Sequence, residues 1–266
     1  MPKTPPKYPT DLNCNEWKIV EPLLPKCEVK RCRKWSMLSI INAIFYVTRS
    51  GCAWRMLPKD MPAWQTIYGY FWRYVKSDVW RLINQALVEK VRVKQGRKTQ
   101  PSAAIMDSQS VKTSEGGESR GIDVYKQTPG RKRHILVDTL GLLLTVMVHS
   151  ASIPDGNGGK LLLKAFFEHV KRYSTSRAYR LRTIYADGAY ADITWFVKFY
   201  FGWLIKVVKR PSSVKGWLTL PKRWIVERTF AWLGKYRRLA RDYEHTTASS
   251  ESFVYIASIR RMLKSL

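Results

Sequence analysis

Apolar residues recur at helical spacing through the first third of the chain. Asn13 is followed three residues later by Glu16, a capping-box pattern that predicts the start of a helix. The apolar run WSMLSIINAIFYVTRSG predicts a second helix that ends at Gly51. A third helix is predicted in AWQTIYGYFWRYV, and a fourth begins near Val79 with Ser77 as its cap. The first part of the chain is therefore predicted to be helical.

The period of the pattern changes after the polar stretch EKVRVKQGRKTQPS, which contains glycine and proline. Short apolar runs then predict strands in AAIMD, RKRHILVDTLG, LLLTVMVHSA, TIYAD and WLIKVVK. Helical spacing returns in GKLLLKAFFEHVKRY, in ITWFVKFYF and in a long helix from about Pro221. Such an order indicates an α/β fold, with a mixed sheet covered by helices. We therefore expect a helical domain at 1–97 and an α/β domain at 98–266.

Basic residues dominate the composition, with 47 Lys and Arg against 20 Asp and Glu and a net charge of +27. This excess favours nucleic acid or an anionic membrane as the partner. The longest apolar runs, such as LGLLLTVMV, are well short of the roughly 20 residues that span a bilayer. The N-terminus MPKTPPKYPT has no apolar core of a signal peptide. We therefore expect a cytoplasmic protein that binds nucleic acid and no membrane.

Two features imitate binding motifs without matching them. The four cysteines have no C-x2-C spacing and no nearby histidine, so reduced thiols are favoured over a zinc site; they are Cys14, Cys27, Cys32 and Cys52. The stretch DGNGGK resembles a phosphate-binding loop, but Pro154 takes the place of its first glycine and Leu161 follows the lysine. We expect this stretch to be an ordinary loop.

Three acidic residues occupy positions that could bring them together. Asp107 closes the run AAIMD, Asp187 closes TIYAD, and Glu227 lies in the predicted final helix. Carboxylates on strands and a facing helix suit hard Mg²⁺ ions, and paired ions can cleave a phosphodiester. By spacing alone, the aspartates could equally be turn residues, and Glu227 could be the ion-pair partner of Arg223. Asp138, at the end of another apolar run, is more typical of a turn acceptor.

Basic residues near these carboxylates are candidate contacts to DNA phosphates. The segment GRKRH contributes Arg131, Lys132 and Arg133. A solvated basic strand is the alternative for this segment. On one continuous helix, Arg223 and Arg238 would lie within about 40° of Glu227. The N-terminal helices suit a helix-turn-helix-like module that binds DNA phosphates.

The segments around the carboxylates are long and specific: DSQSVKT, GRKRHILVDTLGLLL, ADGAY and RWIVERTFAWLGKYRRLARDYE. Through them, and through YPTDLNCNEW and NAIFYVTRSGCAWRMLPKD, the sequence resembles bacterial DDE transposases of the insertion-sequence-five family over nearly its whole length. The resemblance implies a ribonuclease-H-like catalytic domain. It also implies that Asp107, Asp187 and Glu227 hold Mg²⁺, as two ions, with Mn²⁺ as a substitute.

The resemblance further implies an activity on double-stranded DNA. A transposase binds the terminal inverted repeats of its element, cleaves there and transfers the strand to target DNA, as a homodimer or larger assembly on paired ends in the nucleoid. Arg223, Lys235 and Arg238 are the expected DNA contacts near the carboxylates. Two positions depart from the family pattern, since Leu220 replaces a tyrosine and Gly234 a basic residue. The alternatives are an inactive copy that only binds DNA and a nuclease that never joins strands.

Overall fold

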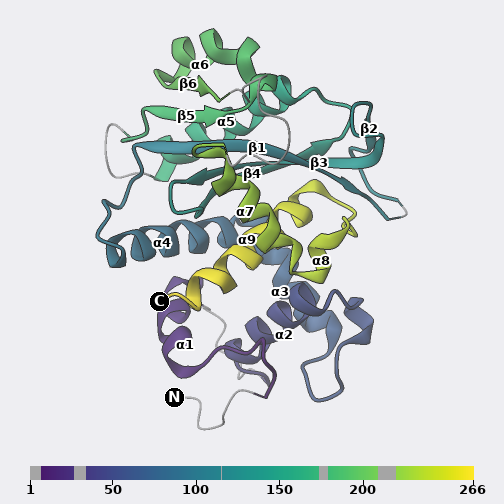
Figure 1. The fold of residues 1–266 in the computed structure, drawn as a ribbon. Helices are drawn as coiled ribbons and strands as arrows, with labels where there is room; N and C mark the ends of the chain where they lie inside the picture. The colour runs from purple at the N-terminus through teal and green to yellow at the C-terminus, as the bar shows by residue number, and fades with distance from the viewer. Residues whose placement is uncertain (1–6, 27–33, 115, 174–178, 209–219) are drawn as a thin grey trace.

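A computed structural model describes residues 7–26, 34–114, 116–173, 179–208 and 220–266. Helices from the first part of the chain lie at one end of the molecule, and a sheet flanked by helices lies at the other (Figure 1). The helices of the first part are α1 (Cys14–Val20), η1 (Glu21–Leu23), α2 (Met37–Ser50), η2 (Trp54–Met56), α3 (Trp64–Lys76) and α4 (Val79–Lys94). The predicted helical character of this part is confirmed.

The ends of these helices follow mostly from local sequence. The capping box is present, because the Asn13 side chain accepts from the Glu16 amide while the Glu16 carboxylate accepts from the Asn13 amide. Gly51 ends α2 in the left-handed conformation, with φ 72°. The prediction for Ser77 is wrong: its hydroxyl donates back to the Arg73 carbonyl at the end of α3, and α4 starts without a side-chain cap.

The second part contains a six-stranded mixed sheet, which confirms the predicted α/β character. Its strands are β1 (Ala103–Lys112), β2 (Gly121–Asp123), β3 (Thr128–Asp138), β4 (Leu143–Ser150), β5 (Thr183–Ala186) and β6 (Leu204–Val207). The order is β2-β3-β1-β5-β6, and β4 also pairs with β3. The β1–β3 and β3–β4 pairs are antiparallel, whereas β5 is parallel to both β1 and β6. The short strand β2 was not predicted.

The remaining helices cover both faces of this sheet: α5 (Asp155–Tyr173), η3 (Gly188–Ile193), α6 (Thr194–Phe201), α7 (Arg223–Gly234), α8 (Arg237–Ala240) and α9 (Thr247–Leu263). Alternation along β1 separates two apolar cores. Ile105 faces the core shared with the N-terminal helices, α7 and α9. Ala104 and Met106 face the other core, with α5 and α6. Asp107 continues the Ile105 side of the strand and therefore lies on the α7 face.

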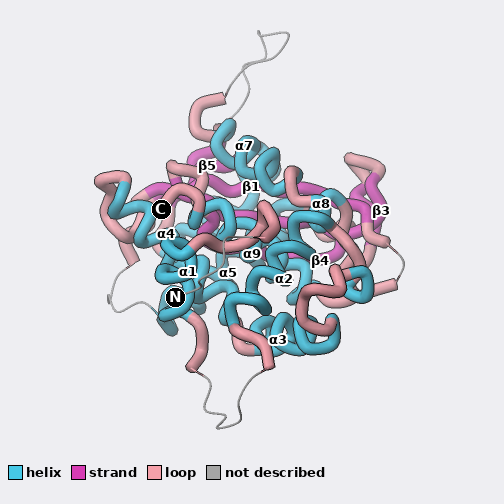
Figure 2. The backbone as a smooth tube through the Cα atoms, turned by 90° about the horizontal axis from the view of Figure 1, so that it is seen from below, coloured by secondary structure: helices cyan, strands magenta, loops and turns pink. Residues whose placement is uncertain are grey.

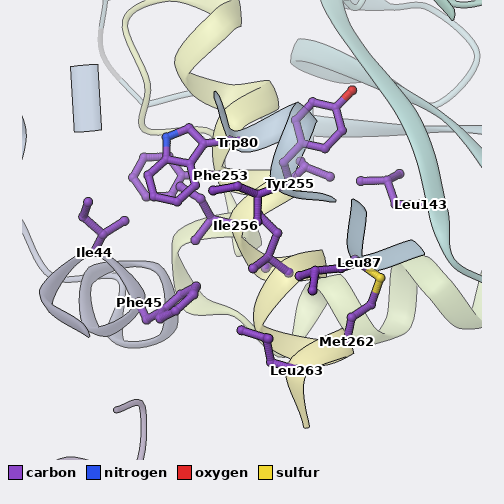
Figure 3. Close-up of a cluster of buried hydrophobic side chains, with 14 of the residues drawn as sticks. Ile44, Phe45, Trp80, Leu87, Leu143, Phe253, Tyr255, Ile256, Met262 and Leu263 are labelled. Atoms are coloured by element: carbon purple, nitrogen blue, oxygen red, sulfur yellow. The ribbon is translucent and has the colours of Figure 1, made fainter. Parts of the chain in front are cut away.

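Helix α9 is the centre of the larger core. It lies between the sheet and the helices α1 and α2 (Figure 1), and in the view from below it crosses the middle of the molecule (Figure 2). Its side chains Phe253, Tyr255 and Ile256 are buried and pack toward Ile44 of α2 and Leu87 of α4 (Figure 3). One apolar core thus crosses the boundary predicted between 1–97 and 98–266.

Two predicted segments differ from the structure. The predicted long final helix is broken, because α7 ends at Gly234 and α8 starts only at Arg237. The stretch DGNGGK is no loop but the start of α5, whose glycines pack closely on neighbouring elements. A Cβ on Gly158 would lie 2.4 Å from the His134 ring. Glycine serves close packing there, which the sequence pattern could not distinguish from a turn.

Only two of the four cysteines lie among the described residues, and the search for membrane spans likewise covers only these residues. Cys14 is exposed and Cys52 is partly buried, while Cys27 and Cys32 lie outside the described residues. Across the part of the chain that the structure describes, every helix is too short or too polar to cross a membrane.

Candidate active site

Asp107 lies in the middle of β1, opposite Ile135 of β3. One of its carboxylate oxygens accepts from the Ser108 amide at 2.7 Å. Burial raises the pKa of Asp107 to about 6, and the nearby Asp187 carboxylate acts in the same direction. The Ser108 amide, Arg223 and Lys126 act in the opposite direction. The Asp107 carboxyl group is therefore partly buried. One further acid, Asp187, and two cations, Arg223 and Lys126, are close enough to shift its pKa.

Asp187 follows β5 directly and forms the N-cap of η3, where its side chain accepts from the Ala189 amide at 3.0 Å. The parallel register of β1 and β5 pairs Ile105 with Tyr185. Asp107 and Asp187 each lie two residues further along their strand, so the sheet itself brings the two acids together.

Glu227 reaches the site from α7, which packs on β1. The Arg223 guanidinium lies 3.7 Å from an oxygen of Glu227 and 3.7 Å from an oxygen of Asp187. The i,i+4 ion pair between Arg223 and Glu227, which was the alternative to a metal-binding role for Glu227, is therefore present. The same arginine also joins the helix to the end of β5. The Glu227 side chain is 53% exposed, which leaves this corner of the site open to solvent.

The chemistry of these donors fits a hard divalent cation. All three side chains offer carboxylate oxygens, which Mg²⁺ prefers, and the repulsion between Asp107 and Asp187 is of the kind that a cation relieves. The three carboxylates are not close enough together to surround one ion in this structure. Among the described residues, no group of three or more His, Cys, Asp and Glu side chains lies close enough together to hold a metal. The Arg223 guanidinium provides the positive charge between Asp187 and Glu227.

The basic segment of β3 was predicted to contact DNA or, alternatively, to form a solvated face. The structure shows neither arrangement. Arg131, Lys132 and Arg133 are all buried, with at most 4% exposure. The Arg131 guanidinium donates to three backbone carbonyls, those of Glu118, Glu244 and His245. Lys132 donates to Ile153, and Arg133 donates to Leu239 and Arg241. In this structure the three cations bind protein carbonyls inside the fold, so we withdraw them as phosphate contacts.

Arg238 is also withdrawn as a DNA contact. The break after α7 removes it from the Glu227 face, and its buried guanidinium forms a two-point ion pair with Glu244 at 2.7 Å. Lys235 is exposed just beyond α7. Arg223 and Lys235 therefore remain candidates, whereas Arg238 serves the fold. Asp138 is a turn acceptor as expected, because it accepts from the Leu140 and Leu142 amides.

A polar network behind β1 was missed by the sequence analysis. The Ser108 hydroxyl donates to Asp155 at 2.9 Å, and Lys132 lies 3.0 Å from the same carboxylate. His134 and His149 share a hydrogen bond of 2.8 Å beside it, and burial lowers the pKa of His134 to about 3. Ser108 neighbours Asp107 on the strand, so this network fixes β1 from the opposite face. The sequence feature that could have indicated this network is the pair Asp107-Ser108. Consecutive side chains of a strand point to opposite faces, so one of these two polar residues had to face the α5 side of the sheet.

Comparison with known families supports the site's context. Residues 98–260 match a family model described as "Transposase DDE domain", and residues 12–84 match one described as "Putative transposase of IS4/5 family". The first match contains all three carboxylates. The second covers most of the N-terminal helices.

One individual relative matches a smaller part of the chain than the family models do. The chain is 28% identical over 122 residues to "Insertion element IS402 uncharacterized 16.2 kDa protein" of Burkholderia cepacia, over 42% of this chain and 77% of that protein. No solved structure matches the chain.

Proposed function

This chain belongs to the transposase DDE domain family, and we propose that it mobilises an insertion sequence of the insertion-sequence-five group. Its substrates would be double-stranded DNA at the terminal inverted repeats of that element and at a target site. The observation that carries this proposal is the pairing of the strands that hold Asp107 and Asp187, together with the Arg223 guanidinium of α7, which lies between Asp187 and Glu227. The sheet and its flanking helices would correspond to a ribonuclease-H-like domain.

Asp107, Asp187 and Glu227 would hold Mg²⁺, as two ions, with Mn²⁺ as a substitute. Such ions, when bound, activate the attacking oxygen and stabilise charge on the leaving oxygen. The protein contributes rigid placement. Asp107 is fixed by the Ser108 amide, and Asp187 by its cap bond to η3. Arg223 balances the carboxylate charge and can turn toward a DNA phosphate, which guanidinium groups bind bidentately.

The reaction has two displacements at phosphorus. Water attacks the phosphodiester at the transposon end and releases a 3′-hydroxyl as the P–O3′ bond breaks. That hydroxyl then attacks a target phosphodiester, and the target's own 3′-oxygen leaves. One P–O bond forms for each that breaks, so the second step needs no external energy source.

DNA would be held by exposed cations and by the N-terminal helices. The net charge of +27 supports a polyanionic partner. Arg223 and Lys235 are the candidate contacts beside the carboxylates. Two transposon ends would be joined by at least a dimer of this chain, by analogy with catalysis at paired ends.

A strand-transfer assay tests this proposal. Labelled DNA from the flanks of the gene, including the inverted repeats, is incubated with target plasmid and Mg²⁺ or Mn²⁺. Wild type should yield cleaved and joined products, and Asp107→Asn, Asp187→Asn or Glu227→Gln should each lower the rate at least about 100-fold. Glu168→Gln, at an exposed carboxylate on α5, is the matched control and should remain active.

Each other result assigns a different function. Cleavage without joining identifies a nuclease. DNA binding without cleavage in wild type identifies an inactive copy. Equal cleavage by the carboxylate variants and wild type removes these residues from the active site.

A further inference from the structure

Tyr190 is a buried tyrosine of η3, the short helix that Asp187 caps. Its side chain is 1% exposed and belongs to the core on the α5 side of the sheet. The ring meets the His134 ring edge to face, with 5.9 Å between the centroids. A Cβ on Gly159 of α5 would lie 3.0 Å from two carbons of the Tyr190 ring, so the ring lies directly on the α5 backbone. These contacts hold η3 against α5 and β3.

The Tyr190 hydroxyl is buried, and no hydrogen-bond partner reaches it from the part of the chain that the structure describes. An unpaired buried hydroxyl destabilises a fold, because it has given up its bonds to water without replacing them. Phenylalanine would fill the same space without this loss. The hydroxyl therefore needs an explanation other than the stability of the fold.

The groups around this hydroxyl belong to the carboxylate site and to the network behind β1. Burial raises the pKa of Tyr190 well above its usual value, and the carboxylates of Asp107 and Asp155 act in the same direction. The Ser108 hydroxyl acts against them, which places it near the Tyr190 oxygen. Ser108 gives its own hydrogen to Asp155, so its oxygen can accept one from Tyr190.

Tyr190 is linked to both aspartates. Within η3 its amide donates to the Asp187 carbonyl at 3.3 Å. On β1 the Ser108 amide donates to the Asp107 carboxylate at 2.7 Å. Tyr190 packs on the α5 face of the sheet, whereas Asp107 lies on the α7 face. The tyrosine therefore acts on Asp107 through Ser108, and on Asp187 through η3.

The network around Tyr190 is one small movement short of complete. His134 Nε2 is also buried without a hydrogen bond, and it lies 3.7 Å from an oxygen of Asp155. As the structure describes them, Asp107, Asp187 and Glu227 are too far apart to hold one ion together. A shift of η3 toward β1 would bring Asp187 toward Asp107 and the Tyr190 hydroxyl toward Ser108.

We propose that Tyr190 is a positioning residue of the metal site. When a divalent cation draws Asp187 toward Asp107, the Tyr190 hydroxyl donates to Ser108 and holds η3 in that position. The hydroxyl thus contributes to cation binding and not to the stability of the fold described here. This inference rests on the proposed function, because it takes Asp107 and Asp187 to be metal ligands.

The test compares Tyr190→Phe with wild type in two measurements. In a Mn²⁺ titration followed by electron paramagnetic resonance, with DNA from the gene's flanks bound, the variant should bind Mn²⁺ about 10-fold more weakly. This is the size expected when a bond that supports a metal ligand is lost. In urea unfolding without metal, Tyr190→Phe should have a midpoint equal to or higher than that of wild type, because the fold loses no hydrogen bond.

Ser108→Ala tests the partner of the hydroxyl. This change keeps the amide that holds Asp107 and removes the oxygen that would accept from Tyr190. The double variant of Tyr190→Phe and Ser108→Ala should bind Mn²⁺ no more weakly than Ser108→Ala alone, because both changes remove the same bond. Additive losses would overturn the assignment of Ser108 as the acceptor.

Tyr255→Phe is the matched control. Tyr255 is 4% exposed, and its hydroxyl lies 3.3 Å from the Thr145 hydroxyl and 3.3 Å from the Val146 amide. Its loss should lower the urea midpoint, because these bonds belong to the fold, and should leave Mn²⁺ binding unchanged. Tyr190→Phe is expected to show the opposite pattern.

The failures of the two proposals differ. If wild type binds Mn²⁺ more tightly than Tyr190→Phe but neither cleaves nor joins DNA, the transposase proposal fails and the role of Tyr190 stands. If wild type cleaves DNA and Tyr190→Phe binds Mn²⁺ equally tightly, the inference about Tyr190 is overturned. A urea midpoint that falls in Tyr190→Phe as it does in Tyr255→Phe would also overturn it, because the hydroxyl would then already be paired in the fold. If wild type binds no Mn²⁺, both proposals are overturned.

Discussion

Arg131 is the most completely buried cation among the described residues, with 0% exposure. Its guanidinium lies 3.4 Å from Asp242, whose side chain is equally buried. Arg131→Ala should lower the free energy of unfolding by about 3–5 kcal/mol, because it leaves the Asp242 charge buried and unpaired. Urea denaturation followed by circular dichroism measures this change.

The exposed Lys126 provides the comparison, since Lys126→Ala should change the stability by no more than about 0.5 kcal/mol. If Arg131→Ala has the same free energy of unfolding as wild type but binds DNA more weakly, Arg131 is a phosphate contact and the structural role assigned to it is refuted.

Glu251 gives the stability a dependence on pH. Burial raises the pKa of Glu251 to about 7, while the Val148 amide and Arg81 act against the rise. Between pH 4.5 and 7, Glu251 of the folded protein keeps a proton that the unfolded chain releases, so the contribution of this group to the free energy of unfolding falls as the pH rises. The fall should amount to at most about 3 kcal/mol and should disappear in Glu251→Gln, whose amide oxygen can still accept from Val148. Urea unfolding of both proteins at pH 5 and pH 8 checks it; parallel curves would refute the assignment.

At the scale of residues, the positions of Asp107 and Asp187 on neighbouring strands followed from the sequence pattern, whereas the positions of the basic residues did not. Asp107 and Asp187 close apolar runs, and strands that pair in parallel bring such ends together whatever their context. The cations could not be placed this way. Arg131 and Arg238 are buried because carbonyls and acids from the 241–245 region reach them, and no local pattern records such distant partners.

At the scale of elements, the start of α5 can be tested through its glycines. A Cβ on Gly158 would lie 2.4 Å from a carbon of His134 and 2.5 Å from a nitrogen of His149. Gly158→Ala should therefore lower the free energy of unfolding by about 1–3 kcal/mol, although alanine favours a helix. Denaturant unfolding measures the change.

The matched substitution is Gly69→Ala in α3, where nothing lies within 4 Å of the added carbon. It should stabilise the protein by about 0.5–1 kcal/mol. A stabilising Gly158→Ala would show that α5 is less tightly packed on the two histidines than the structure indicates.

Most elements were predictable because each follows a local pattern, such as the capping box of α1 or Gly51 after α2. The failures are tertiary. The glycine-rich start of α5 is helical because the histidines need the space, and the final helix breaks after Gly234 although its apolar spacing continues. The strand β2 has only three residues, too few to show a period.

At the scale of the whole molecule, the N-terminal helices and the sheet share one core around α9. The separate fragment 98–266 would expose the buried face of α9, including Phe253 and Ile256, to water. We expect this fragment to aggregate or to lose cooperative unfolding, as measured by calorimetry. A fragment that melts cooperatively as a monomer would show that the division at 97/98 separates independent domains.

The central claim is that Asp107, Asp187 and Glu227 form one metal site. The most direct measurement is a Mn²⁺ titration followed by electron paramagnetic resonance, with DNA from the gene's flanks bound. Wild type should bind Mn²⁺, and Asp187→Asn should weaken that binding by at least about 10-fold, whereas Glu168→Gln should not. Equal Mn²⁺ binding by wild type and Asp187→Asn would contradict the claim.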